Sequence, residues 1–371
     1  MEFDLTEEQR MLADTVDRLL EKRYDPNARL ALLDSEAGWS RELWQQYAEL
    51  GLLGLPFEEQ YGGAGMGVAE LAVVMESFGR ALVLEPYLAS VVLGGQLVAL
   101  AGSPEQKTEI LPLLAAGETL LAFACAEPDS RWSLTDISTM AVNEGGRWEL
   151  NGTKIAVLGG DSADRIVVTA RTPDGEIGLF LVDAADVRRD AYPMQDGLRG
   201  ADLLLDGAPA QALGSPAEAL AHVQAVLDIA TAVLCAEAVG AMDRMLWLTV
   251  DYLKTRVQFG QPIAVFQALQ HRAADMYVAL EQARSMALLA RLALSADEVA
   301  ERRRSVQAAK IQIDLSSRLI GQEAIQLHGG IGMTMEYPLG HYVRRTTVIA
   351  KTFADTDQLI DAVGSGGGLV H

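Results

Sequence analysis

The first third of the chain has the hydrophobic periodicity of helices. Between residues 11 and 20, apolar side chains recur every three or four positions, which predicts an amphipathic helix. Thr6 and Gln9 precede this run at the spacing of a capping box, in which each side chain satisfies a backbone N–H at the helix start. Similar signals predict further helices that begin after Ser40, at Val68 and after Ser103.

The pattern changes near residue 119. From there the apolar segments are short, rich in β-branched residues and separated by turn residues, as in β-sheets. Turns are expected at 144–146, 151–152 and 173–175, each of which contains glycine. We therefore expect a small antiparallel β unit with strands at 120–126, 147–150, 154–158, 165–170 and 177–182.

The helical period returns after Pro216. Long apolar-periodic stretches cover about 218–255, 264–294 and 299–328, and helices of this length usually pair into a bundle. The expected fold class is therefore α+β and mainly α. Its predicted domains are an N-terminal helical domain (1–118), a middle antiparallel β-barrel-like domain (119–214) and a C-terminal four-helix bundle (215–371).

Composition narrows the possible partners and the cellular location. The 371 residues carry a formal net charge of −21, and an acidic surface repels both nucleic acid and anionic membranes, so we expect neither as a partner. Cys125 and Cys235 lie in apolar runs, which favours buried free thiols, and we predict no metal site. The N-terminus is acidic and polar rather than a signal peptide, and no apolar stretch is long enough to span a membrane without a charge or turn signal. A cytoplasmic protein is expected.

Several motifs along the chain resemble those of the acyl-CoA dehydrogenase family. The longest are 252–263 (YLKTRVQFGQPI) and 326–338 (QLHGGIGMTMEYP). Because these and shorter motifs occur in the family's order and spacing, the chain is identified as a member over essentially its whole length. It most resembles the type represented by the small subunit of pimeloyl-CoA dehydrogenase. The shorter motifs are 5–9 (LTEEQ), 51–54 (GLLG), 61–63 (YGG) and 197–200 (GLRG).

The resemblance implies a fold and an activity. Members of the family are tetramers that hold FAD at a subunit interface. They desaturate an acyl-CoA thioester by removing the α-proton with a base and transferring the β-hydrogen to the flavin as hydride. Electrons then leave through an electron-transfer flavoprotein. We therefore expect FAD as the cofactor, an acyl-CoA as the substrate and that flavoprotein as a partner.

The resemblance also assigns cofactor positions within the first long motif. Arg256 would pair with the FAD pyrophosphate, because its forked guanidinium matches two phosphate oxygens. Gln258, Phe259 and Gln267 would line the adenosine side. In the family, these positions serve a flavin that the neighbouring subunit mainly holds.

The second long motif supplies another set of expected contacts. Gly329 and Gly330 would allow the backbone to approach a phosphate group closely, since a Cβ atom would block it. Gln326 would hydrogen-bond at the same place. His328, beside the glycines, is expected to be packed or hydrogen-bonded rather than catalytic.

The catalytic base departs from the family pattern. Thr356 and Gln358 match positions that contact FAD from the other side, and alignment on them places Ala354 where the family usually has a glutamate. Alanine cannot accept a proton, whereas abstraction of the α-proton requires a carboxylate near the substrate. Asp355, one residue further along, is the candidate catalytic base in this chain; its alternative role is a helix cap or turn.

A second family position for the base does not supply one either. Some members carry the glutamate on the helix before the Arg-x-x-Phe-Gly run, and here that position is Ala230. Asp228 is two residues away and should therefore point about 200° around the helix. Asp355 remains the better candidate.

Positions that would face this chain's own isoalloxazine ring also differ. Ala126 replaces a hydroxyl-bearing residue, and Phe123 stands where tyrosine is common. Ala156 offers no ring to stack on the flavin, and Leu158 offers no hydroxyl. The residues that would contact the chain's own flavin thus depart from the family pattern. The residues that would contact a neighbouring subunit's FAD match it.

This asymmetry predicts the non-catalytic subunit of an α2β2 complex, which completes the FAD site of a second, acyl-CoA dehydrogenase-like subunit. Three alternatives stay open. One is a self-sufficient dehydrogenase with Asp355 as the base. Another is a flavin monooxygenase or oxidase on the same fold, and the third is a structural relic that binds no flavin. The acyl group, whether dicarboxylyl, steroid side chain, aromatic or fatty, also stays open.

Overall fold

The computed structural model describes residues 5–130 and 132–365, which form two compact units. The bundle unit contains the chain up to residue 29, residues 68–83 and the chain from residue 231 onward. The barrel unit contains residues 30–67 and 84–230. Each unit thus collects segments that are far apart in the sequence.

The barrel unit is built around a β-sheet that closes on itself. Antiparallel pairing runs from β2 to β3, β7, β5 and β4, and a parallel bridge between Met140 and Arg171 joins β4 back to β2. β1 adds to β4 in parallel, and β6 pairs with β7. Branched and small apolar side chains fill the sheet's core. The strands are β1 (Leu121–Ala124), β2 (Met140–Glu144), β3 (Arg147–Leu158), β4 (Arg165–Arg171), β5 (Ile177–Asp183), β6 (Arg188–Pro193) and β7 (Arg199–Ala212).

The expected barrel-like domain is confirmed, but one of its predicted turns is wrong. Residues 151–152 lie within the continuous strand β3, where a register shift between Leu150 and Asn151 absorbs them as a bulge. Gly152 is required there, because a Cβ atom would lie 2.5 Å from Thr139 Oγ1. The other two turns are confirmed, with Gly145, Gly146 and Gly175 at positive φ.

Among the described strands of the barrel unit, sequence periodicity missed β2, β6 and β7. In β2 and β6 most residues face solvent, so the strands lack the apolar alternation that marks a half-buried strand. β7 pairs with three neighbours along its length and is buried only in part.

Helices flank the barrel within the same unit. Ser90 Oγ in the buried π-helix η3 accepts a hydrogen bond from Leu121 N at 2.8 Å, which ties this helix to β1. The capping box of Ser103 and Gln106 is present as predicted. These elements are α3 (Arg41–Glu49), η1 (Leu52–Gly54), η2 (Glu59–Tyr61), η3 (Leu88–Gly95), α5 (Gln96–Ala101), α6 (Pro104–Ala115) and η4 (Ala184–Asp186).

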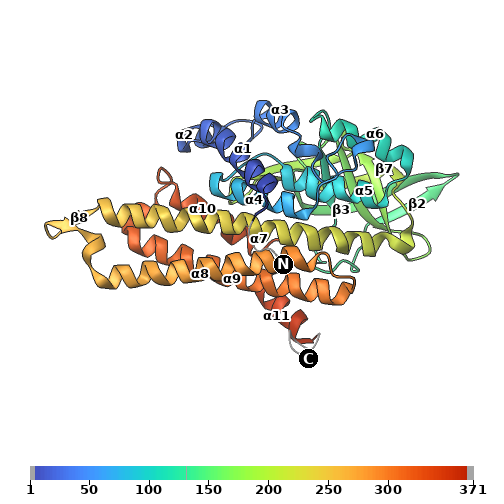
Figure 1. Cartoon of the computed structure of the whole chain (residues 1–371). Helices are drawn as coiled ribbons and strands as arrows, with labels where there is room; N and C mark the ends of the chain where they lie inside the picture. The colour runs from blue at the N-terminus through green and yellow to red at the C-terminus, as the bar shows by residue number, and fades with distance from the viewer. Residues whose placement is uncertain (1–4, 131, 366–371) are drawn as a thin grey trace. The chain divides into compact units, whose positions relative to one another are not determined.

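Long helices dominate the bundle unit, where α7, α8 and α9 run side by side (Figure 1). Ala232, Ala290 and Ala309 bring these three helices together, since small side chains permit close packing. The predicted capping box of Thr6 and Gln9 begins α1. The elements are α1 (Glu7–Arg23), α4 (Val68–Ala81), β8 (Val257–Gln258), β9 (Gln261–Pro262), η5 (Ile263–Val265), α8 (Gln267–Ala293), α9 (Val299–His328), η6 (Gly329–Met333), α10 (Leu339–Ile349) and α11 (Thr356–Ser365). Two further helices, α2 (Pro26–Leu33) and α7 (Pro216–Thr255), contribute residues to both units, and α7 belongs to the bundle unit from residue 231 onward.

Two glycines allow α4 and α7 to touch along their backbones. A Cβ atom on Gly79 would lie 1.9 Å from Glu237 O, and one on Gly240 would lie 1.9 Å from Glu76 O. Beside this contact, Arg345 of α10 makes a buried two-point ion pair with Glu237, with N–O distances of 2.5 and 2.7 Å. These contacts therefore hold α4, α7 and α10 in place relative to one another.

In the described part of the chain, α7 is the single helix long and apolar enough to cross a membrane. Of its most apolar 18-residue window, 83% is buried inside the protein. Such burial is typical of a core helix.

Candidate cofactor site

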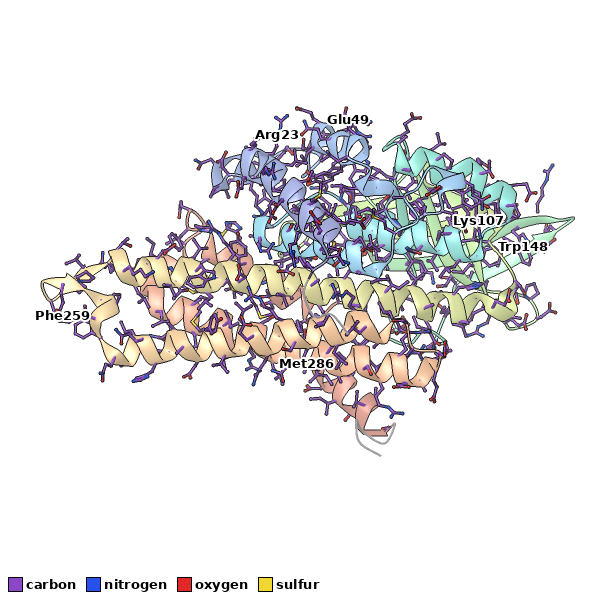
Figure 2. All side chains as sticks on the ribbon, viewed as in Figure 1. Arg23, Glu49, Lys107, Trp148, Phe259 and Met286 are labelled. Carbon is purple, nitrogen blue, oxygen red and sulfur yellow. The ribbon has the colours of Figure 1, made fainter. Side chains whose placement is uncertain are left out.

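A short hairpin at the far end of α7 and α8 carries most of the first motif (Figure 1). β8 and β9 form it, and its turn residues Phe259 and Gly260 have φ values of 55° and 79°. Phenylalanine is rare at positive φ, because its Cβ crowds the backbone there. Phe259 is also 88% exposed and lies at the tip of the hairpin (Figure 2). An exposed ring held in a strained conformation is typical of a functional position.

The polar residues of the hairpin have few contacts of their own. Arg256, Gln258 and Gln267 are all exposed. Within residues 5–130 and 132–365, no side chain pairs with the Arg256 guanidinium, whereas Gln258 Nε2 donates only to the adjacent Val257 O at 2.9 Å. These side chains therefore have donors available for a group outside the chain.

The second motif lies at the end of α9, next to the last turn of α7. Gly329 ends α9 with φ of 65°, and open space surrounds the Cα atoms of Gly329 and Gly330. Gln326 is exposed on the last turn. His328 is buried and stacks on Tyr252 of α7, with ring centroids 4.4 Å apart. The structure thus brings the first two predicted groups to one end of the bundle unit.

The third predicted group, Thr356 and Gln358 at the start of α11, lies away from the hairpin and the glycine turn. Thr356 Oγ1 donates to Asp314 Oδ2 of α9 at 3.3 Å. Asp314 precedes Gln326 by twelve residues, so the start of α11 lies about 18 Å along α9 from Gln326. Asp314 is itself held in a buried pair by Lys310 Nζ, which lies 2.7 Å from each carboxylate oxygen.

The candidate base Asp355 caps α11. Its Oδ1 accepts a hydrogen bond from Gln358 N at 3.0 Å, and its own N–H donates to Gln358 Oε1 at 3.4 Å. Lys351 Nζ lies 4.0 Å from Asp355 Oδ2. The carboxylate is therefore engaged in helix capping. The reciprocal Asp-x-x-Gln spacing signals this role in the sequence.

The two family positions for a glutamate base are filled as the sequence indicates. Ala354 is partly buried, and Ala230 is fully buried. Asp228 is buried and is engaged in an interaction of its own. None of these positions presents a carboxylate with the family's spacing.

In the barrel unit, β3 carries the positions that would face the chain's own flavin. Ala156 is exposed at φ of 52°, and its N–H donates to Asp202 Oδ1 at 2.9 Å beside a break in the β3–β7 register. Leu158 and Ala126 are partly buried, and Phe123 is buried in β1. These side chains provide neither a stacking ring on β3 nor a hydroxyl donor.

Directly beside these positions lies a buried ion pair. Lys154 Nζ is 2.8 Å from Glu127 Oε1, and both side chains are almost fully buried. Four further hydrogen bonds reach the carboxylate, from the N–H and hydroxyl groups of Ser138 and Thr139. Burial opposes ionisation of Glu127, but the hydrogen bonds from Lys154, Ser138 and Thr139 outweigh it and lower its pKa to about 2.

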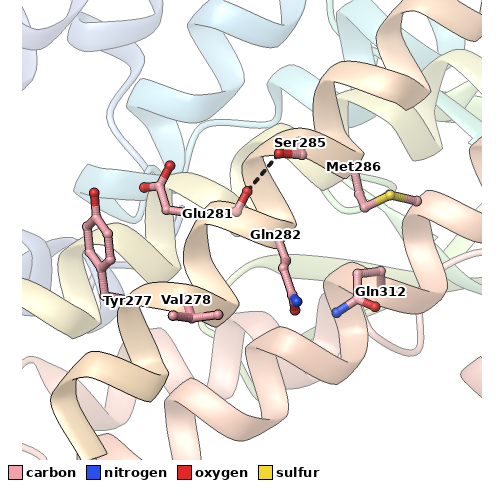
Figure 3. Close-up of a pocket in the computed structure, with 7 residues that line it drawn as sticks. All are labelled: Tyr277, Val278, Glu281, Gln282, Ser285, Met286 and Gln312. Carbon is pink, nitrogen blue, oxygen red and sulfur yellow. Dashed lines mark hydrogen bonds between the residues drawn. The ribbon is translucent and has the colours of Figure 1, made fainter. Parts of the chain in front are cut away.

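An open groove of about 520 Å³ runs along α8 and faces α9 (Figure 3). Tyr277 and Val278, both exposed, form one end, and Met286 of α8 with Gln312 of α9 forms the other. Leu289 of α8 and Leu315 and Leu319 of α9 are also exposed. These two helices therefore carry an unusual number of apolar side chains on the surface.

Comparisons with known proteins agree with the architecture. The sequence profiles for the N-terminal, middle and C-terminal domains of acyl-CoA dehydrogenase match residues 6–118, 122–204 and 220–351. The chain is 31% identical to the probable acyl-CoA dehydrogenase YngJ of Bacillus subtilis over 93% of each chain. The chain belongs to the acyl-CoA dehydrogenase family, a family of oxidoreductases.

Two solved structures show the same fold. One is the ChsE4–ChsE5 complex from Mycobacterium tuberculosis, with a TM-score of 0.89 and 27% identity over 98% of each chain. The other is a glutaryl-CoA dehydrogenase from Mycobacterium smegmatis in complex with FADH2, with a TM-score of 0.90, 25% identity, and coverage of 99% of this chain and 96% of that one.

Proposed function

We propose that this chain is the non-catalytic subunit of an FAD-dependent acyl-CoA dehydrogenase, and that it completes the FAD site of a second subunit of the same family. FAD is the cofactor. The observation that carries the proposal is the exposed hairpin with the strained Phe259 and the solvent-facing Arg256. An aromatic ring with an adjacent guanidinium fits the adenosine and pyrophosphate of a cofactor bound outside this chain.

The barrel unit also supports a non-catalytic role for this chain. The residues of β3 do not fit an isoalloxazine ring of this chain's own, because Ala156 and Leu158 offer neither stacking nor a hydroxyl donor. The carboxylate of Asp355 caps α11 instead of standing free as a base. We therefore assign the base to the partner subunit.

When bound, FAD supplies the hydride acceptor for desaturation of the acyl-CoA. The residues of this chain bind and orient it. Arg256 neutralises the pyrophosphate, and Phe259, Gln258 and Gln267 contact the adenosine side. At the end of α9, Gly329 and Gly330 make room for the phosphate, and Gln326 hydrogen-bonds at the same place. At α11, Thr356 and Gln358 contact a flavin on their own side of the bundle unit.

The partner is a second acyl-CoA dehydrogenase-like subunit in an α2β2 assembly, of the type represented by pimeloyl-CoA dehydrogenase. A similar solved structure is a complex of two differently named chains, ChsE4 and ChsE5. The groove of α8 and the exposed Leu315 and Leu319 of α9 supply apolar surface for such a contact. An electron-transfer flavoprotein accepts the electrons from the assembled enzyme.

The first test measures flavin per polypeptide by visible absorbance, for the chain purified alone and for the complex with its partner subunit. The chain alone should be colourless, and the complex should hold one FAD for each pair of subunits. Near-stoichiometric FAD in the isolated chain would refute the non-catalytic role and return Asp355 to first place as the base.

The second test is the Arg256→Ala substitution in the complex. Loss of a charged hydrogen-bonding group should weaken FAD binding roughly 10- to 100-fold. Lys254→Ala is the matched control, since it removes an exposed cation two residues away. Wild-type FAD affinity in the Arg256→Ala complex would show that the hairpin does not serve the cofactor.

A further inference from the structure

The two loops that we assign to the partner's FAD are joined by three aromatic side chains at the end of the bundle unit. Tyr252 lies in the last turn of α7, His328 is the last residue of α9, and Tyr337 follows η6. The His328 ring stacks on Tyr252 with an interplanar angle of 25° and lies 5.0 Å from the Tyr337 ring. No two of these three residues lie in the same element.

Hydrogen bonds fix the orientation of the central ring. His328 Nδ1 is 2.8 Å from Ala324 O, and Nε2 is 3.0 Å from Tyr337 Oη. A carbonyl oxygen can only accept, so Nδ1 carries the proton, and Nε2 accepts from the Tyr337 hydroxyl. Burial lowers the pKa of His328, which keeps the ring neutral and preserves this tautomer.

Each neighbour of His328 is attached to one of the loops. Arg256 N donates to Tyr252 O at 2.8 Å in the last turn of α7, and Ile263 N donates to Arg256 O at 2.9 Å, so the hairpin continues directly from the turn that carries Tyr252. On the other side, Gly332 packs on His328, where a Cβ atom would lie 3.0 Å from the histidine Cβ. The turn that begins at Gly329 therefore packs against His328, and Tyr337 at its far end hydrogen-bonds to the His328 ring.

We infer that Tyr252, His328 and Tyr337 act as an aromatic lock that holds the Arg256 hairpin and the Gly329 turn in one fixed relation, so that both reach the same cofactor. His328 is a positioning residue, because it is buried and its ring atoms bond within the chain. The inference rests on the proposed function for its purpose, but the lock itself is a property of this chain alone.

Hydrogen–deuterium exchange of the full chain, resolved by mass spectrometry, tests the lock directly. Tyr337→Phe removes a single hydroxyl, and His328→Asn keeps a donor for Ala324 O but does not reach residue 337. Each should raise exchange in segment 329–337 and also in the distant segment 256–263, roughly fivefold for one lost hydrogen bond. Tyr277→Phe, which removes an exposed hydroxyl from α8, is the control and should change neither segment.

Faster exchange confined to 329–337 would overturn the inference, because the ring would then support only its own loop. No change in either segment would overturn it as well. The second readout is the affinity of the complex for FAD. Tyr337→Phe should lower this affinity, and Tyr337→Leu should lower it further because the aromatic ring is lost as well. If the complex holds FAD independently of Arg256 while exchange in 256–263 still responds to residue 337, the proposed function fails and the lock stands.

Discussion

The hairpin end of the bundle unit and the β3 segment of the barrel unit both carry residues that we propose as flavin positions from the family resemblance, but they differ in chemistry. In the hairpin, Arg256 and Phe259 are exposed and have few contacts within the chain. In β3, Ala156 and Leu158 offer neither an aromatic ring nor a hydroxyl group. Beside them, the buried Lys154–Glu127 pair remains fully hydrogen-bonded. The hairpin therefore presents exposed polar and aromatic groups, whereas the charged groups buried in the barrel bond to one another.

The largest expected effect on stability concerns the buried Lys154–Glu127 ion pair of the barrel unit. Glu127→Gln leaves the Lys154 ammonium buried without its counter-charge, and removal of one partner from such a pair costs about 3–5 kcal/mol. Urea denaturation of the purified chain measures the loss. Asp190→Asn is the control, because its pair with Arg188 is exposed at 4.0 Å and should contribute less than about 0.5 kcal/mol.

The dependence of stability on pH provides a second test of the Lys154–Glu127 pair. The folded-state pKa of Glu127 is about 2, below its ordinary value of 4.5, so its ionised form stabilises the fold above pH 4.5. That contribution should fall away between pH 4.5 and 2 in the wild type, whereas the Glu127→Gln variant has no carboxylate to protonate at this position. Parallel pH–stability curves for the two chains would show that the barrel does not depend on this pair.

A middle-sized effect is expected where α4 meets α7. Gly240→Ala forces a methyl group against Glu76 O, and overpacking of this kind costs about 1–3 kcal/mol. Thermal and urea unfolding of the chain measure the change. Gly364→Ala, at a glycine with open space around it, serves as the control. Equal stability of the two variants would mean that α4 and α7 separate at little cost.

The smallest expected effect is a gain in stability rather than a loss. Phe259→Asn places a residue that tolerates positive φ in the hairpin turn, so the chain alone should gain up to about 1 kcal/mol. The same change should weaken FAD retention by the complex, since the ring is lost. A clear loss of stability in the isolated chain would instead show that Phe259 packs within it and is not kept for a partner.

The sequence by itself determined the succession of a helical, a β and a second helical region, because hydrophobic spacing and caps are local. The capping boxes at Thr6 and Ser103 and the long helices after Pro216 follow from residues within one or two turns of each other. The candidate site around Arg256 and Gly329 was predicted from the resemblance of these motifs, in order and spacing, to those of the family.

Only the tertiary structure decided the rest. It turned Asn151–Gly152 into a bulge, because β7 and Thr139 lie against that stretch of β3. It showed the carboxylate of Asp355 engaged as a helix cap, and it stacked His328 on Tyr252, a residue 76 positions away in the chain. These outcomes depend on which distant segments meet, and local periodicity carries no record of such contacts.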